Sequence, residues 1–588
     1  MASADSCVDD IESEAARIVA ALESGETTIS EILGPLFRSG RSASIPLPRG
    51  DDKTRAVVAP EYPMLPESDE VVRATVEHVG PKHLPKLQES YDVVAIGAGV
   101  AGLLTVIVGK ALGKKCLLVE KHYVGGDCLN VGCFPSKCLI ACARKAHEMR
   151  NASDFGVSVP KGEVTVDFPK VMNRMRELRG SIAPHDGVQR YLRDFCEDVA
   201  IAEARFVDKK TIEIFSPRGE GGDDKEEAPP QRVTFDKCFV CTGASATVVA
   251  IPGLREVPHL TNGNFFNLQE LPPRACLIGA GPIGIELAQA LQRCGCAVTI
   301  FEIHSHLLPR EDDDAAALVQ EALLEDGVTV LCGVKLDKVT MSSSSEEETS
   351  LYKSPWPKYV VAATLEDGTR RDFECEAVLN ATGRSPNVSD LGLDLAGVEY
   401  DTRSGVHVDD YGATSNTDVY AAGDVCSAYK FTHAADFMGR VAVRNAFLGA
   451  KEPYSKLLVP WTTYTDPEIA HVGLYEKEID EPYETYVRHL KDVDRCKCEG
   501  ITRGFVKISC RKGTDKILGA TIVGPNAGDL LSEISVALQN DIGLRHIAAV
   551  MHPYPTTAEA IRQCAAQYKP LDKQLTSRVL LELMRRGS

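Results

Sequence analysis

The chain has 588 residues, 44% of them hydrophobic and 25% charged, which is ordinary for a globular protein of several domains. Its formal net charge of −19 disfavours nucleic acid and anionic lipid as partners, and no apolar stretch approaches the length of a membrane span. The 19 cysteines are scattered and no apolar signal segment precedes them, so we predict a reducing compartment, with the cytoplasm as the default.

Residues 1–88 are predicted to be an extension ahead of the first catalytic domain. Residues 11–36 have helical spacing of apolar side chains among acidic ones, and residues 42–68 are rich in proline and charge, as a loosely ordered linker would be. The acid-rich start does not resemble an arginine-rich organelle presequence. Nothing in this part indicates a chemistry.

Residues 91–96 form a predicted buried strand that leads into a glycine-rich turn and a helix. A second parallel strand is expected at residues 116–120, and it ends in an acidic residue. Such glycines permit a tight turn and bring a pyrophosphate close to the helix N-terminus, while the carboxylate holds a ribose hydroxyl pair. The residues predicted for this dinucleotide site are Gly97, Gly99, Gly102 and Glu120.

Cys128 and Cys133 follow this unit, separated by four residues at the start of a predicted helix. The preceding run of Gly125, Gly126 and Asp127 lets the backbone come close to another planar group. A redox-active dithiol beside a flavin is the chemistry that this position suggests. A structural disulfide, or two buried thiols, is the alternative interpretation of the same pair.

The same nucleotide-binding pattern recurs after a predicted strand at residues 275–278, with a second acidic strand end at residues 298–302. One glycine fingerprint is weak evidence. Two of them, each after a strand and each with an acidic residue about 20 positions on, predict two separate dinucleotide sites. In the alternative, one of the two is only a packing turn. The second site is predicted to use Gly279, Gly281, Gly284 and Glu302.

Beyond residue 460 the pattern changes to short strands alternating with helices, which predicts a third, α+β domain. Two segments rich in acidic residues or serine, residues 219–230 and 341–350, are predicted to be surface insertions without a catalytic role. The elements expected in the third domain are strands at residues 486–490, 505–509 and 518–523 and helices at residues 529–539 and 557–567.

Taken in order, these features resemble the FAD-dependent pyridine nucleotide-disulfide oxidoreductases, the family of glutathione reductase, lipoamide dehydrogenase and mercuric reductase. Residues 417–424 are similar to the family's second flavin motif, and residues 381–387 to the turn that leads back from the nucleotide domain to the flavin domain. The resemblance covers residues 89–588. It implies an α/β fold with two Rossmann-like dinucleotide-binding domains, for FAD and NAD, and a C-terminal α+β dimerisation domain. The implied domains are residues 89–268 with 384–455 (FAD), 269–383 (NAD(P)H) and 456–588 (dimerisation).

In this family one cysteine exchanges with the substrate and the other lies against the flavin as a thiolate. The resemblance makes Cys128 the interchange thiol and Cys133 the flavin-facing thiol, with Lys137 near flavin N5 and paired with Glu286. A cation there stabilises negative charge on the reduced flavin and on the thiolate. An ordinary solvated ion pair is the alternative. The other residues implied in cofactor binding are Gly126, Thr242, Gly243, Gly383 and Asp424, the last on the ribityl chain.

Glu302 bears on the electron donor, because a carboxylate accepts hydrogen bonds from a free ribose 2′-hydroxyl and repels a 2′-phosphate. We therefore predict NADH over NADPH. His304, His306 and Arg310 lie close by in the sequence and leave NADPH possible, since their charges would soften the repulsion.

The C-terminal region departs from the family pattern. Disulfide reductases of the family carry a His-Pro-Thr-x-Ser-Glu motif that reaches across the dimer interface and acts as an acid/base on the substrate thiol. Aligning on Pro-Thr and the glutamate places Tyr554 at the histidine's position and Glu559 at the glutamate's. Aligning on His552 leaves Thr557 in place of the glutamate and matches fewer residues. Since a phenol with a pKa of about 10 is a poor base at neutral pH, ordinary disulfide reduction, and lipoamide oxidation in particular, is disfavoured.

In having a tyrosine at this position, the chain resembles mercuric reductases and soluble pyridine nucleotide transhydrogenases. Mercuric reductases bring Hg(II) in through a vicinal cysteine pair at the C-terminus, whereas no cysteine follows Cys564 here and the extension holds only Cys7. A soft metal needs at least two thiolates, so the chain is under-equipped for mercuric reduction and no resident metal site is predicted. The remaining close pairs are interpreted as surface thiols (Cys496, Cys498) and as helix packing residues (Cys138, Cys142).

The combined prediction is a homodimeric, mercuric reductase-like FAD enzyme. Hydride passes from NADH to FAD, then to the Cys128–Cys133 disulfide, and then to an unidentified small-molecule or small-thiol acceptor. Nucleic acid and membrane are not expected as partners. Three rivals stay open: direct transfer from flavin to a quinone, a dye, oxygen or a second nicotinamide, a lipoamide dehydrogenase-like activity, and a redox-sensing protein that binds a partner through the extension.

Overall fold

The structure of the chain is a computed structural model that describes residues 85–159, 164–215, 229–341, 350–352 and 354–569. The predicted extension lies outside the described residues except for residues 85–88. Most of the two predicted insertions lies outside them as well.

The predicted FAD-binding domain is built on one sheet with two helices beside it. Its main elements are β1 (Ser90–Ile96), α4 (Val100–Ala111), β2 (Cys116–Glu120), β3 (Asp198–Ile201), β4 (Glu203–Phe206), β5 (Thr211–Phe215), β6 (Gln231–Val240), β18 (Val419–Ala421) and α13 (Thr432–Leu448). The strand order is β3-β2-β1-β6-β5-β4, and β18 also pairs with β6. The strands β3, β2, β1, β6 and β18 are parallel, and β1 and β2 are buried along most of their length, as strands covered on both faces are.

The predicted nucleotide-binding domain repeats this design on a smaller scale. Its elements are β8 (Arg274–Ile278), α10 (Pro282–Cys294), β9 (Ala297–Phe301), α11 (Asp313–Glu325), β10 (Thr329–Leu331) and β14 (Ala377–Asn380), with an antiparallel meander of β11 (Lys335–Met341), β12 (Tyr359–Thr364) and β13 (Arg370–Cys375). The parallel strand order is β10-β9-β8-β14. Both predicted strand–turn–helix units are present, and Glu302 is the first residue after β9.

The third domain is α+β, as predicted. Its elements are β19 (Trp461–Thr463), β20 (Glu468–Gly473), β21 (Tyr483–His489), α14 (Asp494–Cys498), β22 (Phe505–Arg511), β23 (Ile517–Gly524), α15 (Ala527–Gln539), α16 (Leu544–Ala549) and α17 (Glu559–Ala565). The strands form one antiparallel sheet in the order β19-β20-β23-β22-β21. The three predicted strands and two predicted helices of this domain are confirmed, with ends that differ by a few residues.

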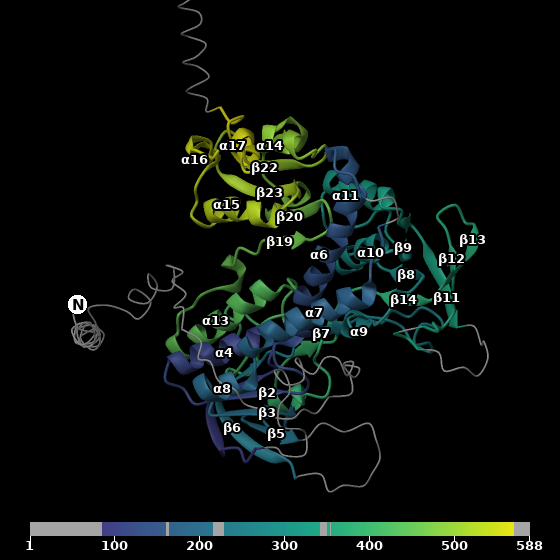
Figure 1. Cartoon of the computed structure of the whole chain (residues 1–588). Coiled ribbons are helices and arrows are strands. Elements are labelled where there is room, and N and C mark those ends of the chain that lie inside the picture. The colour runs from purple at the N-terminus through teal and green to yellow at the C-terminus, as the bar shows by residue number, and fades with distance from the viewer. Residues whose placement is uncertain (1–84, 160–163, 216–228, 342–349, 353, 570–588) are drawn as a thin grey trace, which may run out of the picture.

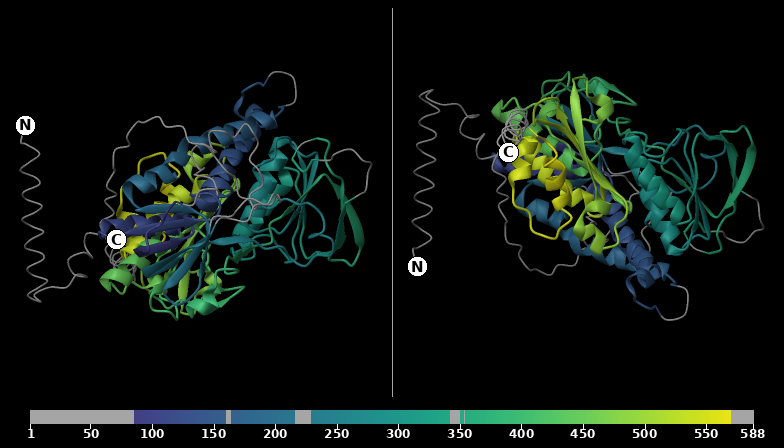
Figure 2. Two further views of the ribbon diagram at one scale, coloured as in Figure 1. Left: turned by 90° about the horizontal axis from the view of Figure 1, so that it is seen from below. Right: turned by 90° about the horizontal axis from the view of Figure 1, so that it is seen from above.

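The remaining helices and strands lie within residues 89–268 and 384–455, the ranges predicted for the FAD-binding domain. They are α5 (Gly126–Asn130), α6 (Cys133–Arg150), α7 (Phe168–Ile182), α8 (Val188–Asp194), the ribbon of β7 (Ala244–Ala246) and β15 (Arg384–Pro386), the short helices α9 (Asn262–Phe265) and α12 (Leu393–Ala396), and the small pair β16 (Tyr400–Asp401) and β17 (Gly405–Val406). The structure also contains several single 3₁₀ turns. In Figure 1, α6 and α7 cross the centre of the molecule, between the third domain above and the FAD-side sheet below. The views from below and above show the nucleotide-binding part standing to one side of the other two (Figure 2).

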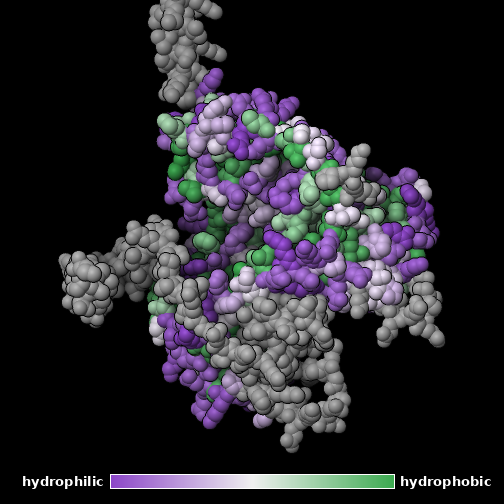
Figure 3. Space-filling model, in the orientation of Figure 1, coloured by the Kyte–Doolittle hydropathy of each residue, from purple (hydrophilic) through white to green (hydrophobic). Residues whose placement is uncertain are grey.

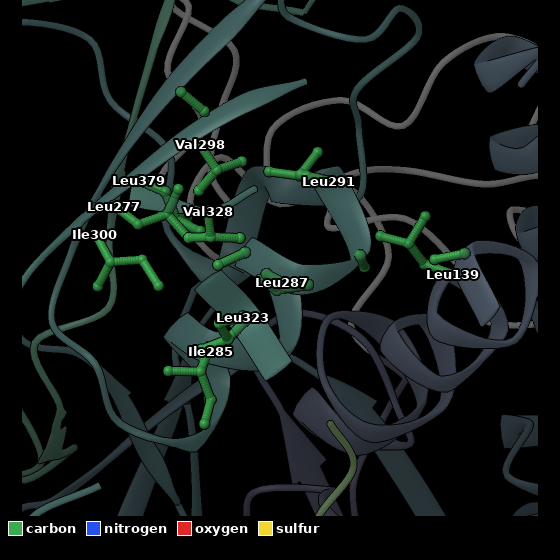
Figure 4. Close-up of a cluster of buried hydrophobic side chains, with 14 of the residues drawn as sticks. Leu139, Leu277, Ile285, Leu287, Leu291, Val298, Ile300, Leu323, Val328 and Leu379 are labelled. Carbon is green, nitrogen blue, oxygen red and sulfur yellow. The ribbon is translucent and has the colours of Figure 1, made fainter. Parts of the chain in front are cut away.

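One hydrophobic core holds the three parts together around α6. Leu139 of α6 belongs to the same buried cluster as Leu287 and Leu291 of α10, and Figure 4 shows Leu139 on the helix that faces α10. Ile469 and Phe505 of the third domain join this cluster. Because burial of each large apolar side chain contributes about 1.5–3 kcal/mol, this shared core fixes α6, and with it the cysteine at its first position.

Candidate active site

The two predicted redox cysteines lie on consecutive helices. Cys128 is inside the five-residue helix α5, and Cys133 is the first residue of α6. The sequence predicted a single helix start here, but the helical conformation is interrupted at Val131 and Gly132, so the two thiols lie on separate helices. Cys128 is half-buried, and Cys133 is exposed. The pair therefore presents one sulfur to open space and keeps the other partly covered.

Cys133 is the more acidic of the two thiols. A hydrogen bond from the Cys128 thiol, a second one from Thr432 and the charge of Lys137 lower the pKa of Cys133 to about 6. The contact with Cys133 raises the pKa of Cys128, so Cys128 stays protonated and donates. Thr432, which begins α13, has its Oγ1 3.2 Å from the Cys133 Sγ. At neutral pH the reduced pair thus holds one thiolate and one thiol.

The predicted ion pair between Lys137 and Glu286 is present beside the thiols. Lys137 Nζ lies 2.9 Å from Glu286 Oε2, and the Glu286 side chain is only 7% exposed. Glu286 Oε1 accepts a hydrogen bond from the Tyr464 backbone N–H at 2.9 Å, and Lys137 Nζ lies 4.2 Å from the centre of the Tyr464 ring. The carboxylate is buried and fully engaged, so the alternative of a solvated surface pair is wrong. The pair joins α6, α10 and the third domain next to Cys133.

The sequence did not single out three further polar residues that lie at this site. Besides Thr432, these are Arg384, which donates to Asp127 and has its Nε 3.6 Å from Asp424 Oδ2, and Lys430, which donates to the Asp424 carbonyl at 2.8 Å. Burial raises the pKa of Asp424 and lowers that of Lys430. Arg384 belongs to the motif at residues 381–387, but a motif does not show which carboxylates its arginine contacts.

The first glycine fingerprint fits the pyrophosphate and ribose of FAD. Gly97 has a φ of +103°, and a Cβ there would lie 2.4 Å from Cys241 O, so only glycine is tolerated. A Cβ at Gly102 would lie 1.9 Å from Gly97 O. No side chain caps α4 at Gly99, which leaves the first N–H groups of this helix directed at an anion. Glu120 accepts hydrogen bonds from two backbone N–H groups at 2.7 and 2.8 Å, which fixes its carboxylate at the strand end that would face a ribose.

The redox segment itself packs onto this fingerprint. Gly126 has a φ of +58°, and a Cβ there would lie 2.7 Å from Gly99 Cα. The Gly125 N–H donates to the Ala98 carbonyl at 2.9 Å. The backbone before Cys128 therefore lies directly against the turn that would hold the flavin nucleotide, and the predicted part of Gly126 in cofactor binding stays a prediction.

The second fingerprint repeats the geometry of the first. Gly279 has a φ of +99°, and a Cβ there would lie 2.6 Å from Ala381 O, while one at Gly284 would lie 2.2 Å from Gly279 O. A Cβ at Gly281 would meet nothing within 4 Å, so packing does not explain this glycine, whereas room for a ligand does. Glu302 accepts from Ala280 N at 2.8 Å and from His304 N at 2.9 Å. These residues fit a nicotinamide dinucleotide, and they disfavour the alternative of a mere packing turn.

Three predicted cofactor contacts lie where the chain passes between the two dinucleotide domains. The Thr242 hydroxyl donates to Asn387 O at 2.7 Å, and Gly243 O accepts from Asn387 N at 3.0 Å. Gly383 O accepts from Thr247 N at 2.9 Å. A Cβ at either glycine would meet no atom within 4 Å. Both glycines thus border open space beside the β7–β15 ribbon, and their predicted part in cofactor binding stays a prediction.

The structure does not bring Tyr554 and Glu559 to the thiols of the same chain. The Tyr554 side chain is 71% exposed and donates to Asp494 Oδ2 at 3.2 Å, while Glu559 accepts from Arg562 at 2.7 Å. His552 is buried, with its Nε2 3.0 Å from Glu533 and its Nδ1 3.1 Å from Val550 O. Both His552 nitrogens are therefore engaged inside the domain. Of His552 and Tyr554, Tyr554 is therefore the one whose side chain is exposed.

Replacing Tyr554 by phenylalanine is expected to change turnover less than threefold. The hydrogen bond to Asp494 raises the pKa of Tyr554, which makes this phenol a still poorer proton source or base near neutral pH. Steady-state kinetics of Tyr554→Phe between pH 6 and 9 would check this. A loss on the order of 100-fold, the usual contribution of a general acid or base, would instead assign Tyr554 a proton-transfer role.

Comparison with known proteins agrees with this geometry. A family model described as pyridine nucleotide-disulphide oxidoreductase matches residues 91–439, and a model of the dimerisation domain of the same family matches residues 459–565. The chain belongs to the pyridine nucleotide-disulphide oxidoreductase family. The predictions of an α/β fold, an FAD-dependent NAD(P)H oxidoreductase and a C-terminal dimerisation domain are thereby confirmed for this family member.

Individual relatives come from two branches of the family. A mercuric reductase of Bacillus cereus is 32% identical over 475 residues, which cover 80% of this chain and 70% of the relative. A dihydrolipoyl dehydrogenase of Mycobacterium bovis is 31% identical over 482 residues, 81% of this chain and 97% of the relative. The crystal structure of LpdA from Mycobacterium tuberculosis superposes with a TM-score of 0.69 at 26% identity, and the match covers 81% of this chain and 99% of LpdA.

Two kinds of feature are absent from the described residues. No helix in the described ranges has both the length and the apolar character required to cross a membrane. Within the same ranges, no group of three or more histidine, cysteine or acidic side chains is arranged to hold a metal ion.

Proposed function

We propose that this family member passes electrons from NADH, through FAD, to the Cys128–Cys133 disulfide and on to a small-molecule or small-thiol acceptor. The observation that carries the proposal is the environment of Cys133. This thiol stands exposed at the start of α6, its pKa is lowered to about 6, and a buried ion pair lies beside it. Bound FAD would supply the two-electron transfer between a reduced nicotinamide and the disulfide.

The residues of the chain divide the thiol chemistry between them. With a disulfide acceptor, Cys128 would attack one acceptor sulfur and form a mixed disulfide, while its proton passes to the other acceptor sulfur, which leaves as a thiol. The Cys133 thiolate would then attack Cys128 Sγ, re-forming the Cys128–Cys133 bond and releasing the second acceptor thiolate. The Lys137 ammonium would stabilise the negative charge of the Cys133 thiolate, and the ion pair with Glu286 keeps that lysine in place.

The preference for NADH is supported by the surroundings of Glu302. Its carboxylate is buried and held by two backbone N–H groups. The His304 Nε2 lies 4.0 Å from it, whereas the carboxylate near the His306 Nε2, at 3.7 Å, is that of Asp313. A fixed carboxylate at this position suits a 2′-hydroxyl and repels a 2′-phosphate.

Replacing Glu302 by alanine is expected to lower the ratio of kcat/KM for NADH over NADPH by at least about tenfold, since it removes a charged hydrogen-bond acceptor worth roughly 1.5–3 kcal/mol. Steady-state kinetics with both nucleotides would measure this ratio. Asp313→Asn is a matched control on the same domain, because its side chain is 94% exposed. A wild-type enzyme that prefers NADPH would contradict the proposal directly.

The proposed assembly is a homodimer through the third domain. The dimerisation-domain match supports it. Figure 3 shows hydrophobic residues among the polar ones on the surface of this domain. A set of exposed apolar and aromatic side chains lies on α15 and between α16 and α17. The members of this set are Val536 (60% exposed), Val550 (54%), Met551 (95%) and Tyr554 (71%). A dimer would cover them and bring Tyr554 towards the partner subunit.

The test of the proposed function is anaerobic titration of the purified holoenzyme with NADH, followed by its absorbance spectrum. A long-wavelength charge-transfer band after two-electron reduction would place the Cys133 thiolate against the flavin and support the dithiol route. Direct bleaching without that band would overturn it. Transfer straight from the flavin to a quinone, a dye or oxygen, or to a second nicotinamide as in a transhydrogenase, would then be the function to pursue.

A further inference from the structure

A second ion pair beside the thiols takes no part in the electron transfer proposed above. The Arg384 guanidinium donates to the Asp127 carboxylate and to the Ala244 carbonyl, and its Nε lies 3.6 Å from Asp424 Oδ2. The side chains of Arg384 and Asp127 are 14% and 32% exposed. A partly buried, charge-assisted contact of this kind fixes direction as well as charge, unlike most pairs at the surface.

Asp127 contacts both ends of the segment that separates the cysteines. It directly precedes Cys128 in α5. Its carbonyl accepts the Val131 N–H at 2.9 Å, and a Cβ at Gly132 would lie 2.9 Å from the same oxygen. Since Gly132 directly precedes Cys133, an anchor on Asp127 restrains the backbone next to both sulfur atoms.

Arg384 stands on the ribbon between the two dinucleotide domains. It is the first residue of β15, where it lies opposite Ala246 of β7 in antiparallel register. Its other neighbour, Asp424, belongs to the second flavin motif. One side chain thus joins the domain-crossing ribbon, the predicted flavin site and the segment that carries the cysteines.

We propose that Arg384 and Asp127 form a positioning pair that holds the Cys128–Cys133 segment at a fixed position relative to the flavin site. The inference rests on the proposed function, because it concerns the same dithiol. Both residues act through the backbone of the segment and not on the reacting sulfur atoms. The position of this segment matters because Cys128 must stay close enough to donate a hydrogen bond to Cys133. That hydrogen bond is the largest cause of the low pKa of Cys133.

The test uses the two-electron-reduced holoenzyme and measures the charge-transfer band as a function of pH. We expect Asp127→Ala to raise the midpoint of this titration by about one pH unit from the wild-type value, because the hydrogen bond between the thiols is weakened. Asp127→Glu keeps the carboxylate and is expected to restore most of the shift. Thermal unfolding of each variant would be recorded alongside.

Glu452→Ala is the matched control. Glu452 accepts from Arg444 in the same domain, and the exposures of that pair, 11% for Arg444 and 39% for Glu452, resemble those of Arg384 and Asp127. It should change stability without moving the midpoint. If Asp127→Ala lowers the unfolding temperature as this control does but leaves the midpoint within about 0.2 pH units of wild type, the pair is merely structural and the inference is wrong. A wild-type enzyme without any charge-transfer band would instead overturn the proposed function itself.

Discussion

Cys133→Ser is expected to lower NADH-dependent reduction of a disulfide acceptor by at least about 1,000-fold, since removing an essential nucleophile leaves only background catalysis. A serine can neither form the disulfide with Cys128 nor supply a thiolate near neutral pH. It also replaces the thiolate that accepts the hydrogen bond from Cys128 with a neutral hydroxyl, which is a weaker acceptor. Steady-state turnover with a small disulfide and, separately, with a quinone or dye would measure the two routes.

Cys142→Ser is the matched control, because Cys142 is a half-buried thiol on the same helix, α6. We expect it to keep both activities. If Cys133→Ser retains most of its turnover with every acceptor, the dithiol is peripheral and transfer from the flavin itself is the function. If only quinone or dye reduction survives, both routes exist and the thiols serve the disulfide route alone.

Lys137→Met is the second change with a large expected effect. Lys137 lowers the pKa of Cys133, whereas Glu286 raises it, so the two side chains act on the thiolate with opposite sign. Without the lysine, the buried Glu286 carboxylate loses its cation, which costs about 1–3 kcal/mol of stability. The pKa of Cys133 then rises from about 6 towards the ordinary value of a thiol. Glu286→Gln is expected to move it in the opposite direction.

The pH dependence follows from these signs. The pKa of Cys133 is lower in the folded protein than in the unfolded chain, so the thiolate is present above pH 6 and is lost as the pH falls through about 6. The charge-transfer band of the wild type should therefore vanish with a midpoint near that value. A pH titration of the charge-transfer band in wild type, Lys137→Met and Glu286→Gln would measure the three midpoints. Identical midpoints would show that the ion pair does not govern the thiolate.

The elements that the sequence predicted best are those that depend on local pattern. The two fingerprints need glycine because a Cβ at Gly97 or Gly279 would collide with a neighbouring carbonyl, and such a requirement is visible in one sequence as a motif. The buried strand before each fingerprint is a continuous apolar run, which is equally local. The break between α5 and α6 was missed, because it depends on Gly132 packing against the Asp127 carbonyl.

The sequence alone predicted the fold class, the two glycine fingerprints and the cysteine pair, since each rests on a motif of fixed spacing. The family resemblance implied the ion pair of Lys137 with Glu286, which the structure contains. Only the tertiary structure decided what surrounds the thiols. Thr432, Tyr464 and Arg384 lie between about 250 and 330 positions from Cys133 in the sequence, yet they contact the thiol segment or its ion pair. Their approach depends on how three domains pack around α6, and that packing follows from a shared hydrophobic core that no local pattern reveals.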